Sequence, residues 1–295
     1  MKKYNFNLQL FAENTTKAAD LAKVRDVDFA ERFSAGIDTL MKMLGVTRKI
    51  AVQEGATLKQ IVVTGTLQNG SVAEGELIPL SKYEAEEVPV GEVKLNKWRK
   101  GTTAEAILKG GYDQAVGATT DKMVKDIQKG IRGDLFTFMA TGTGAATGTG
   151  LQAALANAWG KLAVLFDDDA VESAYFLNPM DVADYLGSAQ VTMQTAFGMT
   201  YIENFLGLGD VFLNSNVPEG KFYATAKENI VMYYVNVATS ELARAFGLTT
   251  DETGYIGINE YPDKDTARVM DLVMSGITFF PERKDGIVVG TIAGA

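Results

Sequence analysis

The chain has 295 residues, of which 46% are apolar, and a formal net charge of −9 at pH 7. It contains no cysteine and no histidine. Disulfides and thiolate metal sites are therefore excluded, and the commonest general base and metal ligand of proteins is missing. An enzyme would depend on carboxylates, lysine or tyrosine, and the acidic balance disfavours a protein that coats nucleic acid by neutralising phosphates.

The length and apolar fraction suit one large domain or two intertwined lobes with a sizeable core. No run of about 20 apolar residues is present, so no transmembrane helix is predicted. Residues 1–12 begin with two lysines, but Asn5, Asn7 and Gln9 interrupt the apolar stretch that a secretion signal needs. We expect a cytoplasmic product with no metal, cofactor or catalytic residue.

Residues 1–27 show no sustained period and are predicted to form an extended arm. Such an arm either frays in solution or pairs with another subunit. The second interpretation rests on the apolar residues Phe6, Leu8, Leu10 and Phe11, which alternate through Leu10 and are candidate inter-subunit contacts. Residues 28–54 then form a helix and a lead-in, with Asp28 and Glu31 as a capping box and Gly45 as the stop.

An acidic excursion lies between the predicted strands 59–63 and 93–98. The bland alternative is a solvated loop, but valines near its end favour a two-stranded loop that projects from the body. Its charged residues are candidate inter-subunit contacts: Glu74, Glu76, Lys82, Glu84, Glu86 and Glu87. Because glutamates dominate, basic partners are expected across the interface.

The longest helical signal runs from Asp113 to Met139, where apolar residues recur every three or four positions. Gly130 and Gly133 each weaken a helix by about 1 kcal/mol relative to alanine, which predicts a bend or a close backbone contact there. The Gly/Thr-rich residues 141–150 follow, and their glycine spacing fits neither a dinucleotide nor a phosphate-binding loop. We therefore expect a linker between two lobes.

The rest of the chain mixes the two periods and predicts an α+β fold. Two pairings are expected, a hairpin of 211–213 with 221–224 and a terminal hairpin of 269–280 with 286–292. The predicted helices are 151–166, 179–186 and 242–246, and the remaining strands are 173–177, 230–235 and 255–261.

In this order the parts contain segments that are similar to one protein family: Asn7–Ala12 (NLQLFA), Ala73–Ser81 (AEGELIPLS), Tyr175–Pro179 (YFLNP) and Val217–Gly220 (VPEG). Over nearly the whole length, the chain resembles the major capsid proteins of tailed bacteriophages, which have the Hong Kong 97-like fold. The resemblance implies an N-arm (1–27), a helix with its lead-in (28–54), an E-loop (55–100), a peripheral domain with a long spine helix (101–150), an axial domain (151–250) and a return to the peripheral domain (251–295).

The resemblance also implies the function. Such a protein is not an enzyme; its copies form hexamers and pentamers and assemble in the host cytoplasm into the icosahedral shell of a virion. The shell encloses double-stranded DNA, and no membrane is involved. A separate scaffolding protein, or a propeptide already removed, is expected together with a portal, because the long amino-terminal scaffolding domain of some members is missing here. Some members crosslink an E-loop lysine to a neighbour's asparagine. Here Lys82 would be the loop lysine, and Asn259 is a conceivable partner only because it lies near the chain's return to the peripheral domain.

Two other functions stay open at this point. Encapsulin nanocompartment shells share the fold but enclose enzymes. A carboxylate-dependent enzyme such as a glycosidase belongs to a different class, and it predicts a concave pocket with two carboxylates about 5–10 Å apart.

Overall fold

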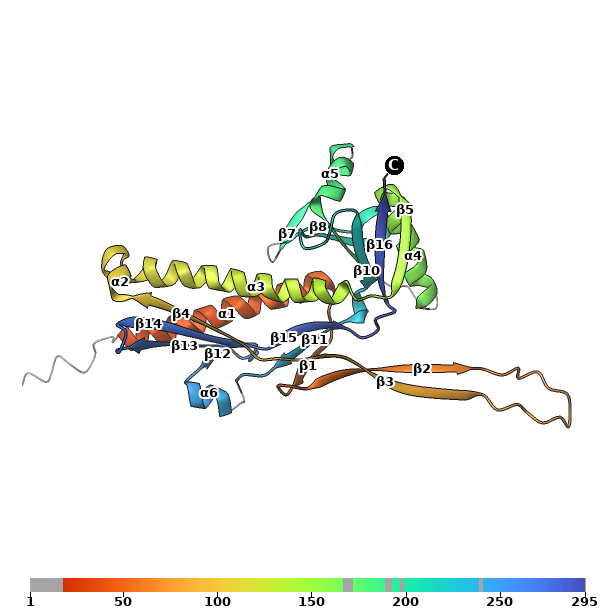
Figure 1. Cartoon of the computed structure of the whole chain (residues 1–295), viewed down its shortest axis with the longest axis horizontal. Helices are drawn as coiled ribbons and strands as arrows, with labels where there is room; N and C mark the ends of the chain where they lie inside the picture. Colours follow the sequence, from red (N-terminus) through yellow and green to blue (C-terminus); the bar gives the residue numbers. More distant parts are fainter. Residues whose placement is uncertain (1–17, 167–171, 189–192, 197–198, 239–240, 295) are drawn as a thin grey trace, which may run out of the picture. The chain divides into compact units, whose positions relative to one another are not determined.

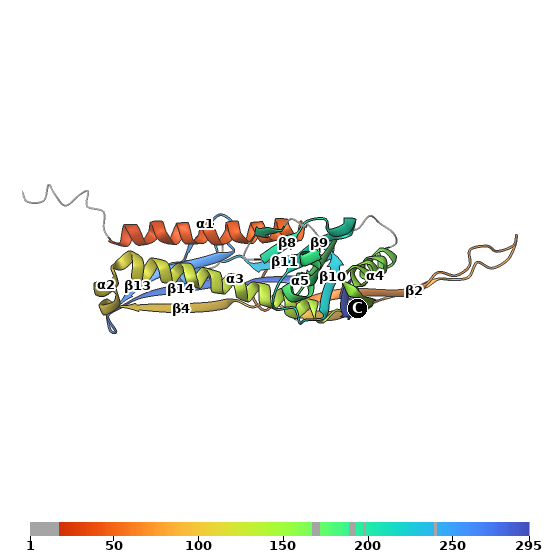
Figure 2. The same cartoon turned by 90° about the horizontal axis from the view of Figure 1, so that it is seen from above.

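The structure, a computed structural model, describes residues 18–166, 172–188, 193–196, 199–238 and 241–294. The chain divides into two units (Figure 1; Figure 2 shows the view from above). Unit 1 combines residues 1–38, 96–129 and 236–275, and unit 2 combines residues 39–95, 130–235 and 276–295. The arm residues Phe6, Leu8, Leu10 and Phe11 lie outside the described part of the chain.

Unit 1 contains a four-stranded antiparallel sheet in the order β12-β13-β14-β4. Its strands are β12 (Thr249–Thr250), β13 (Ile256–Asp263), β14 (Arg268–Ser275) and β4 (Asn96–Thr103). Helices in this unit are the first part of α1 (Ala18–Leu44), α2 (Ala104–Gly110), the π-helical turn η2 (Asp113–Gly117), the start of α3 (Ala118–Met139) and α6 (Glu241–Phe246).

Helix α1 begins earlier than the sequence predicted. It starts at Ala18, so the predicted start at Asp28 and the extended conformation predicted for residues 18–27 are wrong. The capping pattern is misleading because Asp28 lies inside the helix, where it forms an ion pair of 3.0 Å with Arg32 one turn later. The predicted stop is confirmed: Gly45 has a φ of +68°, a conformation that glycine adopts without a steric penalty.

The long helix is confirmed as η2 followed by α3. Ile127, Ile131 and Leu135 on its apolar stripe are buried. Of the bend or close contact predicted at its glycines, the close contact is wrong, because a Cβ added to Gly130 would meet no atom within 4 Å, and the bend stays a prediction. One added to Gly133 would meet only Asn216 Nδ2, at 3.9 Å, and α3 is continuous through both positions.

Unit 2 contains a mixed seven-stranded sheet in the order β5-β16-β10-β6-β9-β8-β7. The strands are β5 (Gly144–Thr149), β16 (Ile287–Ala293), β10 (Lys221–Ala226), β6 (Ser173–Leu177), β9 (Gly209–Leu213), β8 (Met199–Ile202) and β7 (Gln194–Ala196). Helices α4 (Gly150–Leu165) and α5 (Pro179–Ser188) and the short turns η3 (Phe205–Gly207) and η4 (Lys227–Asn229) complete this part. Leu155, Leu162, Tyr175 and Phe222 share its hydrophobic core.

Both predicted hairpins of the second half are wrong. Strand β6 lies between β9 and β10, pairing parallel with the first and antiparallel with the second. The two strands of the predicted terminal hairpin do not pair with each other either. Strand β15 (Ile277–Pro281) pairs with β11 (Ile230–Val235), while β16 pairs with β10. Strand β1 (Lys49–Val52) completes a three-stranded sheet in the order β1-β11-β15. The sequence predicts pairing between strands that follow one another along the chain, whereas in the structure these strands pair with segments farther away in the sequence.

The predicted linker 141–150 is also wrong, because residues 144–149 form β5, which pairs parallel with β16. Its small residues reflect close packing. A Cβ on Gly148 would lie 2.3 Å from the backbone nitrogen of Ala154 in α4, and one on Gly144 would lie 2.8 Å from the carbonyl oxygen of Ile287. Only glycine allows the backbones to approach so closely.

Candidate assembly surfaces

The acidic excursion is a long two-stranded hairpin in unit 2, as predicted, and it extends away from the other strands of that unit (Figure 1). Strand β2 (Thr57–Thr66) includes the predicted strand 59–63 and pairs with β3 (Lys82–Glu92). The predicted strand 93–98 corresponds in part to β4, which begins at Asn96, whereas the second strand of the hairpin ends at Glu92. Exposed glutamates gave that segment no apolar alternation, so its strand conformation depends on the backbone ladder with β2.

The hairpin tip carries apolar side chains that nothing in the described chain covers. Leu77 and Leu80 are each 93% exposed, and Ile78 is 70% exposed. Single exposed apolar residues are normal on protein surfaces, but a cluster around Pro79 at the end of a projecting hairpin is typical of an interaction site.

The predicted contact residues of the hairpin are all exposed. The structure brings Lys82, Glu84, Glu86 and Glu87 together on β3, while Glu74 and Glu76 lie in the loop. Three of these side chains form ion pairs within the hairpin: Lys82 pairs with Glu84, and Glu87 pairs with Lys59 of β2 at 2.7 Å. The hydrogen bond and the charge of Lys59 lower the pKa of Glu87. Residues 66–92 contain six glutamates and one lysine, so this segment has a net charge of −5.

The hairpin is fixed at its base by packing that requires a glycine. A Cβ on Gly91 would lie 2.3 Å from the ring of Phe280, and that ring forms an edge-to-face pair with Phe138 at 4.0 Å between centroids. Next to it, Val93 is fully buried and exchanges backbone hydrogen bonds with the chain at Gly55 and Ala56. The hairpin therefore has an ordered base and an uncovered tip.

A basic groove lies in unit 1 between β4 and α3, which run side by side (Figures 1 and 2). Its volume is about 520 Å³. Lys97 and Arg99 of β4 are exposed there and form no ion pair within the described chain. Lys100 instead has a structural role, because it forms a 2.7 Å ion pair with buried Asp271 and donates to the Val116 carbonyl oxygen.

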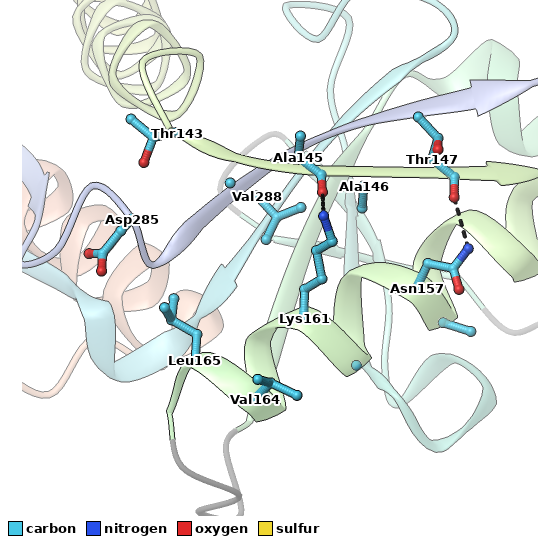
Figure 3. A pocket seen from close by; sticks show the side chains of 13 residues that line it. Thr143, Ala145, Ala146, Thr147, Asn157, Lys161, Val164, Leu165, Asp285 and Val288 are labelled. Carbon is cyan, nitrogen blue, oxygen red and sulfur yellow. Dashed lines mark hydrogen bonds between the residues drawn. The ribbon is translucent and has the colours of Figure 1, made fainter.

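A second groove, in unit 2, is lined by residues of β5 and α4 (Figure 3). Its volume is about 1120 Å³, and among the described residues Lys161 and Asp285 are the charged ones that line it. Lys161 donates to the Ala145 carbonyl oxygen, and Asp285 pairs with Arg283 at 2.7 Å, which lowers the pKa of that carboxyl.

Five carboxylates line a smaller cavity in unit 1: Asp26, Asp28, Asp121, Glu260 and Asp271. Its volume is about 160 Å³, well below the roughly 300–1,000 Å³ of typical ligand sites. Asp28 and Asp121 both pair with Arg32, at 3.0 and 2.8 Å. Among the described residues no three acidic side chains are arranged to hold a metal ion. In the same described part of the chain, no helix is long and apolar enough to cross a bilayer.

No protein-family model and no curated protein matches the sequence. Solved structures do match it. A virus-like particle from Pyrococcus furiosus shares 14% identity over 92% of this chain and 99% of its own, with a TM-score of 0.52. A chain from Mycobacterium phage Patience shares 11% identity over 95% and 94%, with a TM-score of 0.53. The mature capsid of bacteriophage PhiM1 shares 9% identity over 83% and 85%, also with a TM-score of 0.53.

These similarities establish the fold. At such low identity they carry no residue-level correspondence, but they extend over most of each chain. The α+β, Hong Kong 97-like capsid fold expected from the sequence is confirmed.

Proposed function

We propose that this chain, which has the Hong Kong 97-like capsid fold, is a shell-forming protein and, more specifically, the major head protein of a tailed bacteriophage. The observation that carries the proposal is the hairpin β2–β3, whose apolar tip and acidic strand are exposed in the isolated chain. A subunit that builds a closed shell needs surfaces that only its neighbours cover. No enzymatic activity is part of the proposal.

In this proposal the parts have the roles that the resemblance implies. The axial domain (151–250) makes head-to-tail contacts that close hexamers and pentamers. The N-arm (1–27), through Phe6, Leu8, Leu10 and Phe11, and the E-loop (55–100) then extend over neighbouring subunits. Many weak contacts between copies sum to a stable particle without a covalent bond.

The groove between β4 and α3 is the surface that best complements the acidic strand of a neighbour's hairpin. Lys97 and Arg99 offer unpaired positive charge, while Glu86 on β3 has no ion pair within the described chain. Charge contacts of this kind raise the association rate and exclude wrong partners more than they raise affinity. They would also align the apolar tip before it is buried.

The remaining partners follow from the same proposal. A shell assembled in the host cytoplasm and found in the virion encloses double-stranded DNA, and a net charge of −9 keeps the wall from binding DNA strongly. A separate scaffolding protein and a portal would direct closure. A crosslink through Lys82 is not included, because Asn259 already donates to the Phe246 carbonyl oxygen at 2.6 Å.

A nanocompartment shell of the encapsulin type is the second candidate. It stays a candidate because one of the similar structures is a virus-like particle from Pyrococcus furiosus rather than a phage capsid. Both candidates form closed particles, but their contents differ. Purified particles that contain DNA would support the phage shell, and particles that contain a cargo enzyme would support the nanocompartment.

Disulfide trapping tests the hairpin contact, because the chain has no cysteine of its own. A Glu86→Cys variant is co-assembled with an Arg99→Cys variant and oxidised. We expect disulfide-linked dimers only in the mixture, and none when Lys221→Cys, an exposed position on β10, replaces Arg99→Cys. Shells that form without this crosslink would exclude the proposed contact while leaving the shell function standing.

A further inference from the structure

Strand β5 has an open edge that two side chains of α4 close. Within the described sheet β5 pairs only with β16, so its other edge has no strand beside it. Open edges offer backbone N–H and C=O groups to a strand of another chain. At this edge the carbonyl oxygen of Thr147 accepts from Asn157 Nδ2 at 2.8 Å, and that of Ala145 accepts from Lys161 Nζ (Figure 3).

The spacing of the donors matches the spacing of the acceptors. Asn157 and Lys161 are four residues apart, which is about 6 Å along a helix. Ala145 and Thr147 are two residues apart on one side of a strand, which is about 6.6 Å. The donor earlier in the chain binds the acceptor later in the chain, so the helix runs antiparallel to the strand. Two matched bonds indicate a built arrangement rather than one chance contact.

Among the described residues, the space beside this edge forms a groove. The groove has a volume of about 1120 Å³, and the α4 residues facing it include the small Ala156 and Gly160. A Cβ added to Gly160 would meet no atom within 4 Å. Among the described residues, Asn157 and Lys161 are therefore the side chains that occupy the hydrogen-bonding positions of the edge, and α4 leaves room around Gly160.

We infer that Asn157 and Lys161 protect the β5 edge from strand addition by a second copy of this chain. The excluded partner is the same edge of another copy, because two β5 edges related by a twofold axis would pair antiparallel. Blocking this pairing leaves association to other surfaces of the molecule. The inference goes beyond the proposed function, since it applies to the isolated chain whether or not shells form.

The test removes both donors with Asn157→Leu and Lys161→Met. The new strand pairing would gain backbone hydrogen bonds that each contribute modestly, so we expect the association constant to rise about tenfold. Sedimentation velocity measures it under conditions where the unmodified chain does not assemble. Lys161→Arg keeps a donor and should behave like the unmodified chain. Lys221→Met, on β10, removes the same charge from an exposed position and should have no effect.

Single cysteines identify the surface that associates. Ala145→Cys and Thr147→Cys, separately and mixed, should form disulfide-linked dimers in the Leu/Met background and not in the unmodified one. Association that rises without these disulfides would mean that another surface is responsible, and it would overturn the inference, as would no rise at all. If circular dichroism shows that the double variant is unfolded, the single variants Asn157→Leu and Lys161→Met decide the question by the same two measurements.

Discussion

The central sheet of unit 2 and the hairpin β2–β3 belong to the same unit, yet they are held by different interactions. All five residues of β6 are buried, and the Phe176 ring contacts Phe136 and Phe212 at 5.5 and 5.3 Å between centroids. On β3, every residue from Lys82 to Pro89 is exposed. An isolated two-stranded hairpin is marginally stable in water, whereas a strand buried on both faces belongs to a hydrophobic core.

The difference separates folding from assembly. Burial in the sheet supplies free energy that folds unit 2, and β3 contributes little to that free energy because its side chains from Lys82 to Pro89 stay in water. Its exposed charges and apolar tip serve contacts that exist only between copies. Changes in the sheet should therefore alter the stability of the monomer, and changes in the hairpin should alter assembly.

The largest expected effect comes from removing the distal hairpin. Gln60 and Val88 are paired across the ladder, so a short Gly-Ser turn that joins them replaces residues 61–87 and keeps the base at Gly91. We expect complete loss of closed particles, because the neighbour contacts are gone, with the free energy of unfolding changed by less than about 1 kcal/mol. Electron microscopy and urea unfolding measure the two effects. Normal shells, or an unfolded body, would contradict the separation.

Truncating a core ring should have the opposite effect. Phe176→Ala removes a fully buried side chain and should lower the free energy of unfolding by about 3–5 kcal/mol. Its matched control is Leu77→Ala at the hairpin tip, which should change that free energy by about 0.5 kcal/mol or less. Urea titration of both variants compares the two regions directly. Equal losses would show that the tip is buried in the monomer.

A pH-dependent loss should also arise in the sheet. Burial raises the pKa of the Tyr175 hydroxyl from 10.0 to about 12. The unfolded chain then releases this proton at lower pH than the folded chain, so stability is intact below about pH 10 and falls by about 2 kcal/mol as the pH rises to 12. Tyr175→Phe should lose less stability than the unmodified chain between pH 8 and 11, roughly, when both are unfolded with urea. Tyr83→Phe on the hairpin is the control that should retain the full loss.

The smallest expected effect is on the rate of assembly. Reversing Glu84, Glu86 and Glu87 to lysine should slow or misdirect assembly at low salt, and the difference should shrink as salt screens exposed charges. Light scattering at several salt concentrations measures the rate of assembly. The same reversal at the exposed residues Glu241, Glu252 and Asp265 of unit 1 controls for net charge. If both variants assemble at the same rate, the position of the acidic strand does not matter.

The sequence predicted elements better than it predicted pairings. The long helix α3 follows from an apolar period of 3.6 residues, and Gly45 was recognised as a stop because its conformation is local. Which strands meet is not local. The positions of β10 and β16 depend on segments more than 40 residues away from each of them along the chain, so neighbouring strands were joined wrongly. The overall fold came from the order of the parts and the resemblance.

The candidate surfaces were predicted unevenly. The acidic residues of the hairpin were identified because charge patterns are visible in sequence. The glycine and threonine residues that dominate β5 predict a linker. Only the structure shows that position 148 must be glycine because α4 packs against it. Lys161 and Asn157 carried no signal in the sequence. Their spacing of four residues acquires meaning only beside a strand edge.

Negative-stain microscopy of the purified chain, with its scaffolding partner supplied if it has one, is the most direct test of the central claim that the hairpin serves assembly. The unmodified chain should form closed particles of uniform size, and the chain lacking residues 61–87 should show only small particles of folded protein. Closed shells from the shortened chain, or an unmodified chain that forms none, would contradict this account.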